Sequence, residues 1–182
     1  MPKADISFDQ ITKSLEAVPD GEIFAMVSTL GSNLMHAPVT TPENVYTKRP
    51  TPQIGHISDF LVAEAEVLEL LRQYSHQNIF RYHCCQIVRE HFIGPVLDIY
   101  SHDLETFVQD KVGSISHGPF MAALESAIKH LHSHGLAHNN LTSSNIMVNK
   151  EGIPVLIDFG ECQPIGSHLK YIRGTPGWNI GE

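Results

Sequence analysis

The chain has 182 residues, of which 42% are hydrophobic and 18% charged, and this composition is typical of a folded globular protein. Its formal net charge of -8 argues against a nucleic acid or an anionic membrane as the main partner. No apolar run is long enough to span a membrane, and the N-terminus MPKADISFDQ lacks the apolar centre of a secretory signal. The three cysteines match neither a zinc spacing nor a disulfide framework, so we expect a cytoplasmic location, with the nucleus as the alternative.

The first part of the chain is expected to be a polar extension followed by strands. Residues 1–21 are mixed and polar and end in a turn signal. Residues 22–30 have the pattern of a strand, and residues 34–39 that of its hairpin partner. Gly31 begins the loop between them. A further short strand is expected at residues 45–48, where prolines soon end it.

A helix is expected over residues 58–74. Its apolar residues share one face at helical spacing: Phe60, Leu61, Val67, Leu68 and Leu71. Glu64 falls in the middle of this face. Glu66, Glu69 and Gln73 lie on the opposite side. Burying a carboxylate costs free energy unless a cation meets it, so Glu64 is the first indication of chemistry.

The remainder of the chain mixes strands with a second long helix. Strands are expected at residues 79–88 and 91–100, followed by a polar turn. The helix follows Gly118 and stops at Gly135. Short strands and polar loops come after it. Because the strands come mostly first and the helices later, the pattern predicts an α+β fold.

Residues suited to binding a metal ion are concentrated between His138 and Gly160. Asn145 and Asp158 are predicted at the ends of two adjoining strands, where their side chains can converge on one point. Hard divalent cations such as Mg²⁺ take one or two such oxygen ligands, and water and phosphate fill the other positions. The alternative is that both residues shape turns, as Asn and Asp often do.

The order of these residues resembles the active-site motifs of protein kinases. Residues 138–145 and then 158–160 are similar to the catalytic loop and the DFG motif. Lys48 resembles the lysine that holds the α- and β-phosphates of ATP, and Glu64 resembles the helix glutamate that pairs with it. Taken alone, Lys48 is more typical of a lysine on the surface. The alternative for Glu64 is that the predicted phase of the helix is wrong, so that this side chain does not face the core. Considered as a pair, they favour the functional interpretation.

Other stretches agree with this resemblance. The HQNI sequence at residues 76–79 resembles the turn that follows the kinase helix. Residues 96–100 resemble the hinge whose backbone binds adenine, which implies contacts from Asp98 and Tyr100. Asp103 would then lie near the ribose, although capping of the next helix is an equal alternative.

Two stretches are similar to narrower groups within the family. The GTPGW sequence at residues 174–178 resembles the end of the activation segment in Ser/Thr-type kinases. Together with the run at residues 82–84, it is similar in particular to a group of fungal kinase-like proteins.

The resemblance extends over roughly residues 22–178 and implies an α+β protein kinase-like fold. It divides the chain into an N-terminal extension at residues 1–21, an N-lobe at 22–100 and a partial C-lobe at 101–182. The N-lobe should hold an antiparallel sheet and the helix that carries Glu64, and the C-lobe should be mainly helical. Because kinases continue beyond this point, we expect a shortened C-lobe and a partner that covers it.

The sequence departs from the kinase pattern at several positions. Gly31 keeps the first glycine of the phosphate-binding loop, but Asn33 and His36 stand where the other two are expected. Gly31 also fits a plain hairpin turn. Asn139 replaces the arginine that grips a phosphorylated activation loop, and Thr142 replaces a lysine that contacts the γ-phosphate.

Asn140 is the most consequential departure, because it stands where the catalytic aspartate belongs. An amide cannot act as a base at neutral pH, and general-base assistance contributes roughly 10²–10⁴-fold to a rate. The metal-binding residues remain, and phosphoryl transfer depends heavily on positioning and on neutralising charge. The loss of the base is therefore predicted to weaken transfer severely without abolishing nucleotide binding.

The leading hypothesis is a kinase-fold protein that binds ATP and Mg²⁺, of the class that transfers the γ-phosphate to Ser or Thr of a protein. A pseudokinase that serves as a binding or regulatory module is the alternative. A small-molecule phosphotransferase is a second alternative, against which the GTPGW and HQNI motifs stand. The expected partner is a protein substrate or binding partner, and neither a nucleic acid nor a membrane.

Overall fold

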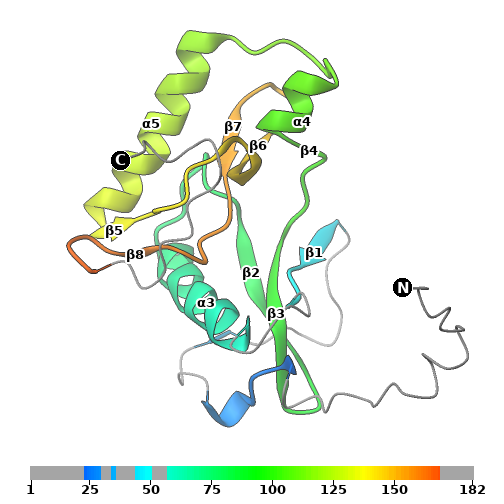
Figure 1. Ribbon diagram of the computed structural model, residues 1–182, viewed down its shortest axis with the longest axis vertical. Helices are drawn as coiled ribbons and strands as arrows, with labels where there is room; N and C mark the ends of the chain where they lie inside the picture. Colours follow the sequence, from blue (N-terminus) through cyan, green and yellow to red (C-terminus); the bar gives the residue numbers. More distant parts are fainter. Residues whose placement is uncertain (1–22, 30–33, 36–43, 51–56, 169–182) are drawn as a thin grey trace, which may run out of the picture.

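The computed structural model describes residues 23–29, 34–35, 44–50 and 57–168. Within these ranges the chain forms two groups of elements (Figure 1): a twisted sheet with one helix along its side, and a second group built on another long helix. The predictions for the extension before residue 22, for Gly31, Asn33 and His36, and for the GTPGW motif lie outside the described residues.

The first group is a three-stranded antiparallel sheet in the order β1-β3-β2. Its strands are β1 (Val45–Thr47), β2 (Tyr82–Val88) and β3 (His91–Asp98). The last two form the expected hairpin, and each is shorter than predicted by two or three residues at one end. Arg89 and Glu90 make its turn, both with positive φ (49° and 64°). Positive φ at both central residues is the twist that a tight hairpin requires.

The prediction of a strand at residues 22–30 is wrong for residues 23–29, the part of this stretch that the structure describes. Only residues 25–27 pair with the β2–β3 hairpin, through hydrogen bonds from Phe92 N to Ala25 O and from Val27 N to Glu90 O. The chain then enters the 3₁₀-helix η1 (Val27–Thr29). Val27 pairs with Glu90, which lies in the turn of the hairpin. The hairpin therefore offers no further backbone with which residues 28 and 29 could pair.

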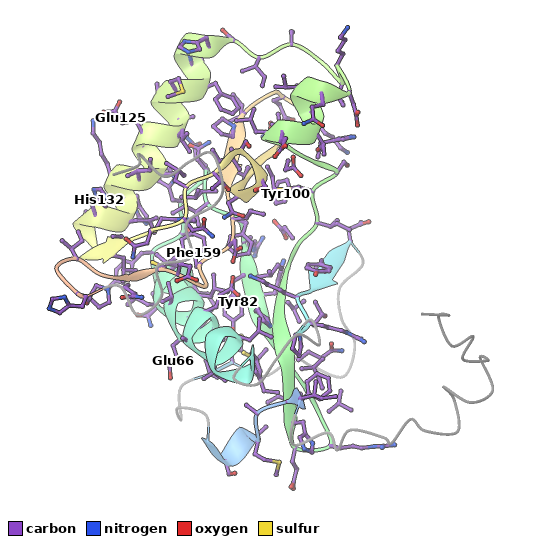
Figure 2. The ribbon with its side chains drawn as sticks, in the orientation of Figure 1. Glu66, Tyr82, Tyr100, Glu125, His132 and Phe159 are labelled. Atoms are coloured by element: carbon purple, nitrogen blue, oxygen red, sulfur yellow. The ribbon has the colours of Figure 1, made fainter. Side chains whose placement is uncertain are left out.

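The helix α3 (Ile57–Gln73) confirms the prediction and packs against β2 and β3. Leu61, Ala65 and Leu68 are buried, and Glu64 lies among them with 1% of its surface exposed. The prediction for Glu69 is wrong, because this side chain is also buried, at 8% exposure. In Figure 2, Tyr82 lies beside α3 whereas Glu66 lies on its outer side.

The burial of Glu69 has a clear physical reason. Its carboxylate meets the hydroxyl of Tyr82 and the backbone N–H of Met35, which cover a second face of α3. A helix covered over such a wide arc buries positions that a single apolar stripe would leave in solvent.

The second group combines a small sheet, in the order β4-β6-β7, with two helices. Its elements are β4 (His102–Asp103), α4 (Leu104–Gln109), α5 (His117–Ser133), β5 (Leu136–Ala137), η2 (Ser143–Asn145), β6 (Ile146–Val148), β7 (Pro154–Leu156) and β8 (Gln163–Pro164). The buried face of α5 consists of Phe120, Leu124, Ala127 and Leu131. Gly135 follows the helix with φ of 72°, a conformation that glycine adopts without strain.

The two groups are joined by backbone hydrogen bonds between residues 78–80, which follow α3, and strand β7. Phe80 N donates to Leu156 O at 3.0 Å, and Leu156 N donates to Asn78 O at 2.8 Å. The side-chain amide of Asn78 donates to Pro154 O at 2.9 Å. Buried apolar residues of both groups form one core. Among the described helices, none is both long enough and apolar enough to cross a bilayer.

Histidine rings make a second contact between the groups. The rings of Tyr74, His134, His130 and His76 follow one another with centroid distances of 4.4, 4.6 and 4.9 Å. His76 Nδ1 accepts the N–H of Asn78 at 3.1 Å, so this nitrogen carries no proton. The arrangement therefore holds His76 in its neutral form.

Mild acid should weaken the fold at this histidine row. Burial, with the neighbouring His130, lowers the pKa of His76, so the folded chain binds protons less readily than the unfolded chain. The free energy of unfolding should therefore decrease as the pH falls below about 6.5. Because the ring is partly solvated, we expect an effect of about 0.5 kcal/mol or less.

Urea unfolding at neutral pH and in mild acid measures this effect. His76→Gln should reduce the loss of stability in acid, whereas His132→Gln, which changes an exposed ring on α5, should leave it unaltered. A loss of the same size in all three proteins would contradict the assignment to His76.

Candidate functional site

Three charged side chains from different parts of the chain meet at the junction of the two groups. Lys48 Nζ lies 2.9 Å from Glu64 Oε1 and 2.8 Å from Glu64 Oε2, so both oxygens of this carboxylate face the ammonium. The same nitrogen lies 2.7 Å from Asp158 Oδ1. The pairing predicted between Lys48 and the core-facing Glu64 is therefore present, and Asp158 joins it from the second group.

Lys48 follows directly after β1, and its backbone is held by β3. Lys48 N donates to Pro95 O at 3.0 Å. Beside it, Gly94 has φ of 150°, and a Cβ atom on this residue would lie 1.7 Å from the carbonyl oxygen of Lys48. Only glycine permits so close an approach of the two backbones. Gly94 is thus a requirement for the position of the lysine.

Phe159 connects the charged cluster to the core. Its N–H donates to Glu64 Oε1 at 3.1 Å, and its ring is fully buried. The ring stacks on Phe80 at 5.4 Å and meets the edge of His138 at 5.0 Å. Figure 2 shows Phe159 near the centre of the molecule, between the two groups of elements. This packing fixes the backbone next to Asp158, whose own φ is 63°.

The electrostatics of the cluster keep the lysine charged. Burial lowers the pKa of Lys48, but the negative charges of Glu64 and Asp158 outweigh burial and raise the pKa above its ordinary value. Burial also opposes ionisation of Asp158, yet Lys48 holds the pKa of this carboxyl below its usual range. At Glu64 burial dominates and raises the pKa. Lys48 therefore presents a permanent positive charge.

A cavity of about 460 Å³ opens beside this cluster. It is lined by Tyr46, Lys48, Glu64, Phe80, Leu97, Asp98, Ile99, Tyr100, Met147, Ile157 and Asp158. Apolar side chains make up most of its wall, and three of its charged residues form the cluster at one place, which is the usual make-up of a small-molecule site. The structure thus brings five predicted site residues to one cavity: Lys48, Glu64, Asp98, Tyr100 and Asp158.

Of the predicted residues that the structure describes, Asp103, Asn140 and Asn145 do not line the cavity. Asp103 caps α4, where its Oδ1 accepts the N–H of Thr106 at 2.7 Å, so the capping alternative is present. Asn145 Nδ2 donates to Asn140 O at 2.9 Å. The carbonyl of Asn145 accepts the N–H of Ile157 at 3.0 Å, which places its backbone beside the segment that leads to Asp158.

Asn140 lies in a loop that is held by its neighbour His138. Burial lowers the pKa of His138, and the neutral ring accepts the N–H of Asn140 at Nδ1 (3.3 Å). With Nδ1 accepting, Nε2 carries the proton and donates to Ile157 O at 2.9 Å. Among the described residues, only the backbone of Asn140 forms hydrogen bonds, with His138 and Asn145.

Asp158 and Asn145 carry the type of oxygen atom that Mg²⁺ prefers. Asp158 offers a half-exposed carboxylate, and the amide nitrogen of Asn145 is engaged, which leaves its oxygen as an acceptor. The described residues contain no group of three or more His, Cys, Asp or Glu side chains arranged to hold a metal. Magnesium does not need such a group, because one or two protein oxygens with water and phosphate satisfy it.

Comparison with known proteins identifies the family. Residues 50–181 match the family model of the protein kinase domain. The chain belongs to this family. The expected α+β protein kinase-like fold is therefore confirmed. Lys48 lies just before the matched stretch, so its assignment rests on the contacts with Glu64 and Asp158 described above.

The similar curated proteins are Ser/Thr-protein kinases. The chain is 27% identical over 122 residues to TAO3 of Homo sapiens, 28% over 122 residues to TAO1-A of Xenopus laevis, and 26% over 129 residues to TAO2 of Homo sapiens. These alignments cover 63% to 67% of this chain and 10% to 13% of the relatives. The chain thus spans only a small part of their length.

One solved structure matches part of this chain. The crystal structure of the yeast RNA Pol II CTD kinase CTDK-1 complex aligns with a TM-score of 0.47 and 21% identity. The alignment covers 55% of this chain and 34% of the matched chain.

Sequence reasoning missed two residues that shape this kinase site. Gly94 interrupts an otherwise apolar strand, and a glycine inside a strand is a signal for close backbone approach. Phe80 lines the cavity and stacks on Phe159, but its position directly after HQNI carries no distinctive pattern. Only the three-dimensional structure shows the role of Phe80.

Replacing Gly94 by alanine should displace Lys48. The added Cβ would overlap the Lys48 carbonyl, so one of the two backbones must move, and we expect a loss of about 2–4 kcal/mol in the free energy of unfolding. Urea unfolding measures this loss. Gly118→Ala on α5 is the matched control, because no heavy atom lies within 4 Å of its added Cβ. Equal stability of both variants would contradict the close approach.

Proposed function

We propose that this kinase domain binds ATP in the cavity beside Lys48, with adenine against residues 97–100 and the phosphates toward the charged cluster. The observation that carries the proposal is Lys48 Nζ within 2.9 Å of both Glu64 and Asp158 at the wall of the cavity. A cation fixed in this way lies where a triphosphate needs positive charge. The N–H of Asp98 is donated to Arg81 O, so at the base Asp98 would accept through its backbone carbonyl and Tyr100 would donate through its backbone N–H.

Each residue of the cluster has a defined task in this proposal. Glu64 holds the lysine in place, since its own position is fixed by the helix and by the N–H of Phe159. Asp158 and Asn145 would hold Mg²⁺, which supplies charge neutralisation on the phosphates when it is bound. The apolar wall around Leu97 and Met147 excludes water from the base.

The reaction class we propose is transfer of the γ-phosphate of ATP to Ser or Thr of a protein. The similar proteins named above are Ser/Thr-protein kinases, which supports this class. Asn140 makes the transfer slow, because its amide cannot take the proton of the substrate hydroxyl. Cys84, Cys85 and Cys162 are free and buried, and these thiols support a cytoplasmic or nuclear location.

A nucleotide-binding module without transfer is the second candidate function. Asn140 is the observation that favours it, because the phosphate-side cluster is assembled while the base is replaced by an amide. In that case the nucleotide would stabilise the domain for contact with a protein partner.

ATP should raise the melting temperature by several degrees at saturating concentration, and Mg²⁺ should increase the shift. Lys48→Met should remove most of the shift, because it deletes the cation of the site. Lys129→Met, which changes an exposed lysine on α5, should retain it. Thermal unfolding with and without ATP and Mg²⁺ measures each shift. The absence of stabilisation in both conditions would sink the proposal of a nucleotide site.

Restoring the carboxylate tests the reaction class. Asn140→Asp should increase phosphate transfer from radiolabelled ATP to a generic protein substrate by roughly 10²–10⁴-fold, since it supplies the missing base. Asn139→Asp adds the same charge at the adjacent position and should give no such gain. If Asn140→Asp binds ATP but transfers nothing, the transferase proposal is wrong and the binding module stands.

A further inference from the structure

A second cavity, of about 650 Å³, adjoins the cavity beside Lys48. Phe80, Asp98 and Tyr100 line both cavities, so these three residues form a shared wall. The charged cluster around Lys48 lines the first cavity and is not part of the second. Small-molecule sites measure roughly 300–1,000 Å³, so the second cavity has the size of a ligand site in its own right.

The buried part of the lining of the second cavity is apolar. It lies around the end of α3 and the start of β2, and its members are 1% to 8% exposed: Leu68, Leu71, Ile79, Phe80 and Tyr82. The hydroxyl of Tyr82 donates its hydrogen to Glu69 Oε1 at 2.8 Å, so the tyrosine offers its ring to the cavity. Such a surface favours a ligand with an apolar or aromatic part.

Two exposed arginines, Arg72 and Arg81, line the outer part of the second cavity. Among the described residues, Arg81 forms a hydrogen bond only through its backbone, whose carbonyl accepts the N–H of Asp98 at 3.1 Å. Arg72 uses its Nε on Glu69 at 2.9 Å, and its terminal nitrogens bond to no described residue. A guanidinium presents its N–H groups as a fork that matches a carboxylate or a phosphate.

The acidic residue of this lining is already engaged. Asp98 Oδ1 accepts a hydrogen bond from Nε2 of His83, another lining residue, at 2.6 Å. The whole chain has 20 acidic residues against 12 lysines and arginines, whereas this lining has two arginines and one aspartate. Positive charge is therefore concentrated at the second cavity of an otherwise acidic protein, which fits an anionic ligand.

We propose that the second cavity binds a small organic anion, with its apolar part on the buried lining and its carboxylate or phosphate at Arg81. The ligand also favours binding in the first cavity, an extension that rests on the proposed function. Because Arg81 O accepts the N–H of Asp98, a ligand that holds Arg81 also holds the backbone against which adenine would lie. Coupling between two sites is reciprocal, so ATP should favour the anion equally.

Benzoate, phenyl phosphate and the uncharged benzamide are suitable probes. In an NMR titration of the full chain, the two anions should shift the amide signals of residues 79–83. Benzamide keeps the ring without the charge and should bind about threefold to fivefold more weakly than benzoate. Comparison of the two anions shows whether the site prefers a carboxylate or a phosphate. Equal binding of benzoate and benzamide, or binding of neither anion, would overturn the proposal.

Arg81→Gln tests the residue assigned to the anion. It should weaken benzoate binding about threefold to fivefold, since it removes an exposed cation. Arg89→Gln is the matched control, because this arginine is exposed in the turn of the same hairpin and does not line the cavity. Lys48→Met should also retain benzoate binding. A loss in Lys48→Met would place the anion in the first cavity and contradict the proposal.

The coupling to the nucleotide site has its own measurement. Isothermal titration with adenosine, which carries no charge to compete at Arg81, should show about fivefold tighter binding in saturating benzoate than without it. An unchanged affinity for adenosine would disprove the coupling and leave the anion site. If neither adenosine nor ATP binds, the proposed function and the coupling both fail, whereas the benzoate titration decides the second cavity independently.

Discussion

The ammonium of Lys48 between two carboxylates is the constraint on which the functional part of this structure depends. Glu64 belongs to a helix and Asp158 follows a strand of the second group, so a single cation draws together elements that are far apart in the sequence. The buried carboxylate of Glu64 would not be tolerated at its position without the lysine, because desolvating an unpaired charge costs several kcal/mol. The ionic contact therefore explains why the helix, the sheet and the Asp-Phe-Gly turn occupy one junction.

The helix α3 connects this contact to other parts of the structure. Along one side it presents Glu64 to the ammonium and the apolar core, and along the next it presents Glu69 to a tyrosine hydroxyl and a backbone amide. Two buried carboxylates on one helix are unusual, because each requires its own set of donors. Outside α3 itself, the donors come from four separate stretches of chain, so the position of α3 depends on all of them.

Much of the fold and of the site followed from the sequence. The apolar period of α3 placed Glu64 in the core, and this argument needed no motif to suggest its lysine partner. Spacing failed at Glu69, since helical periodicity says which residues share a face but not how many faces the surrounding chain covers. The prediction of a strand also failed at residues 28–29, because no neighbouring strand is present there for them to pair with. The role of Phe80 depends on a ring contact with Phe159, which sequence alone does not show.

The short stretch around β7 limits which mutations this chain can tolerate. Pro154 and Leu156 bond to the residues before β2, Asp158 meets Lys48, and Phe159 bonds to Glu64. Pro154 and Leu156 occupy alternating positions of β7, where a shift by one residue turns each residue to the opposite face, and Asp158 and Phe159 follow within three residues of the strand. Insertion or deletion of a single residue here would therefore break the links together. Point substitutions can be absorbed one at a time, but the length of this stretch is fixed.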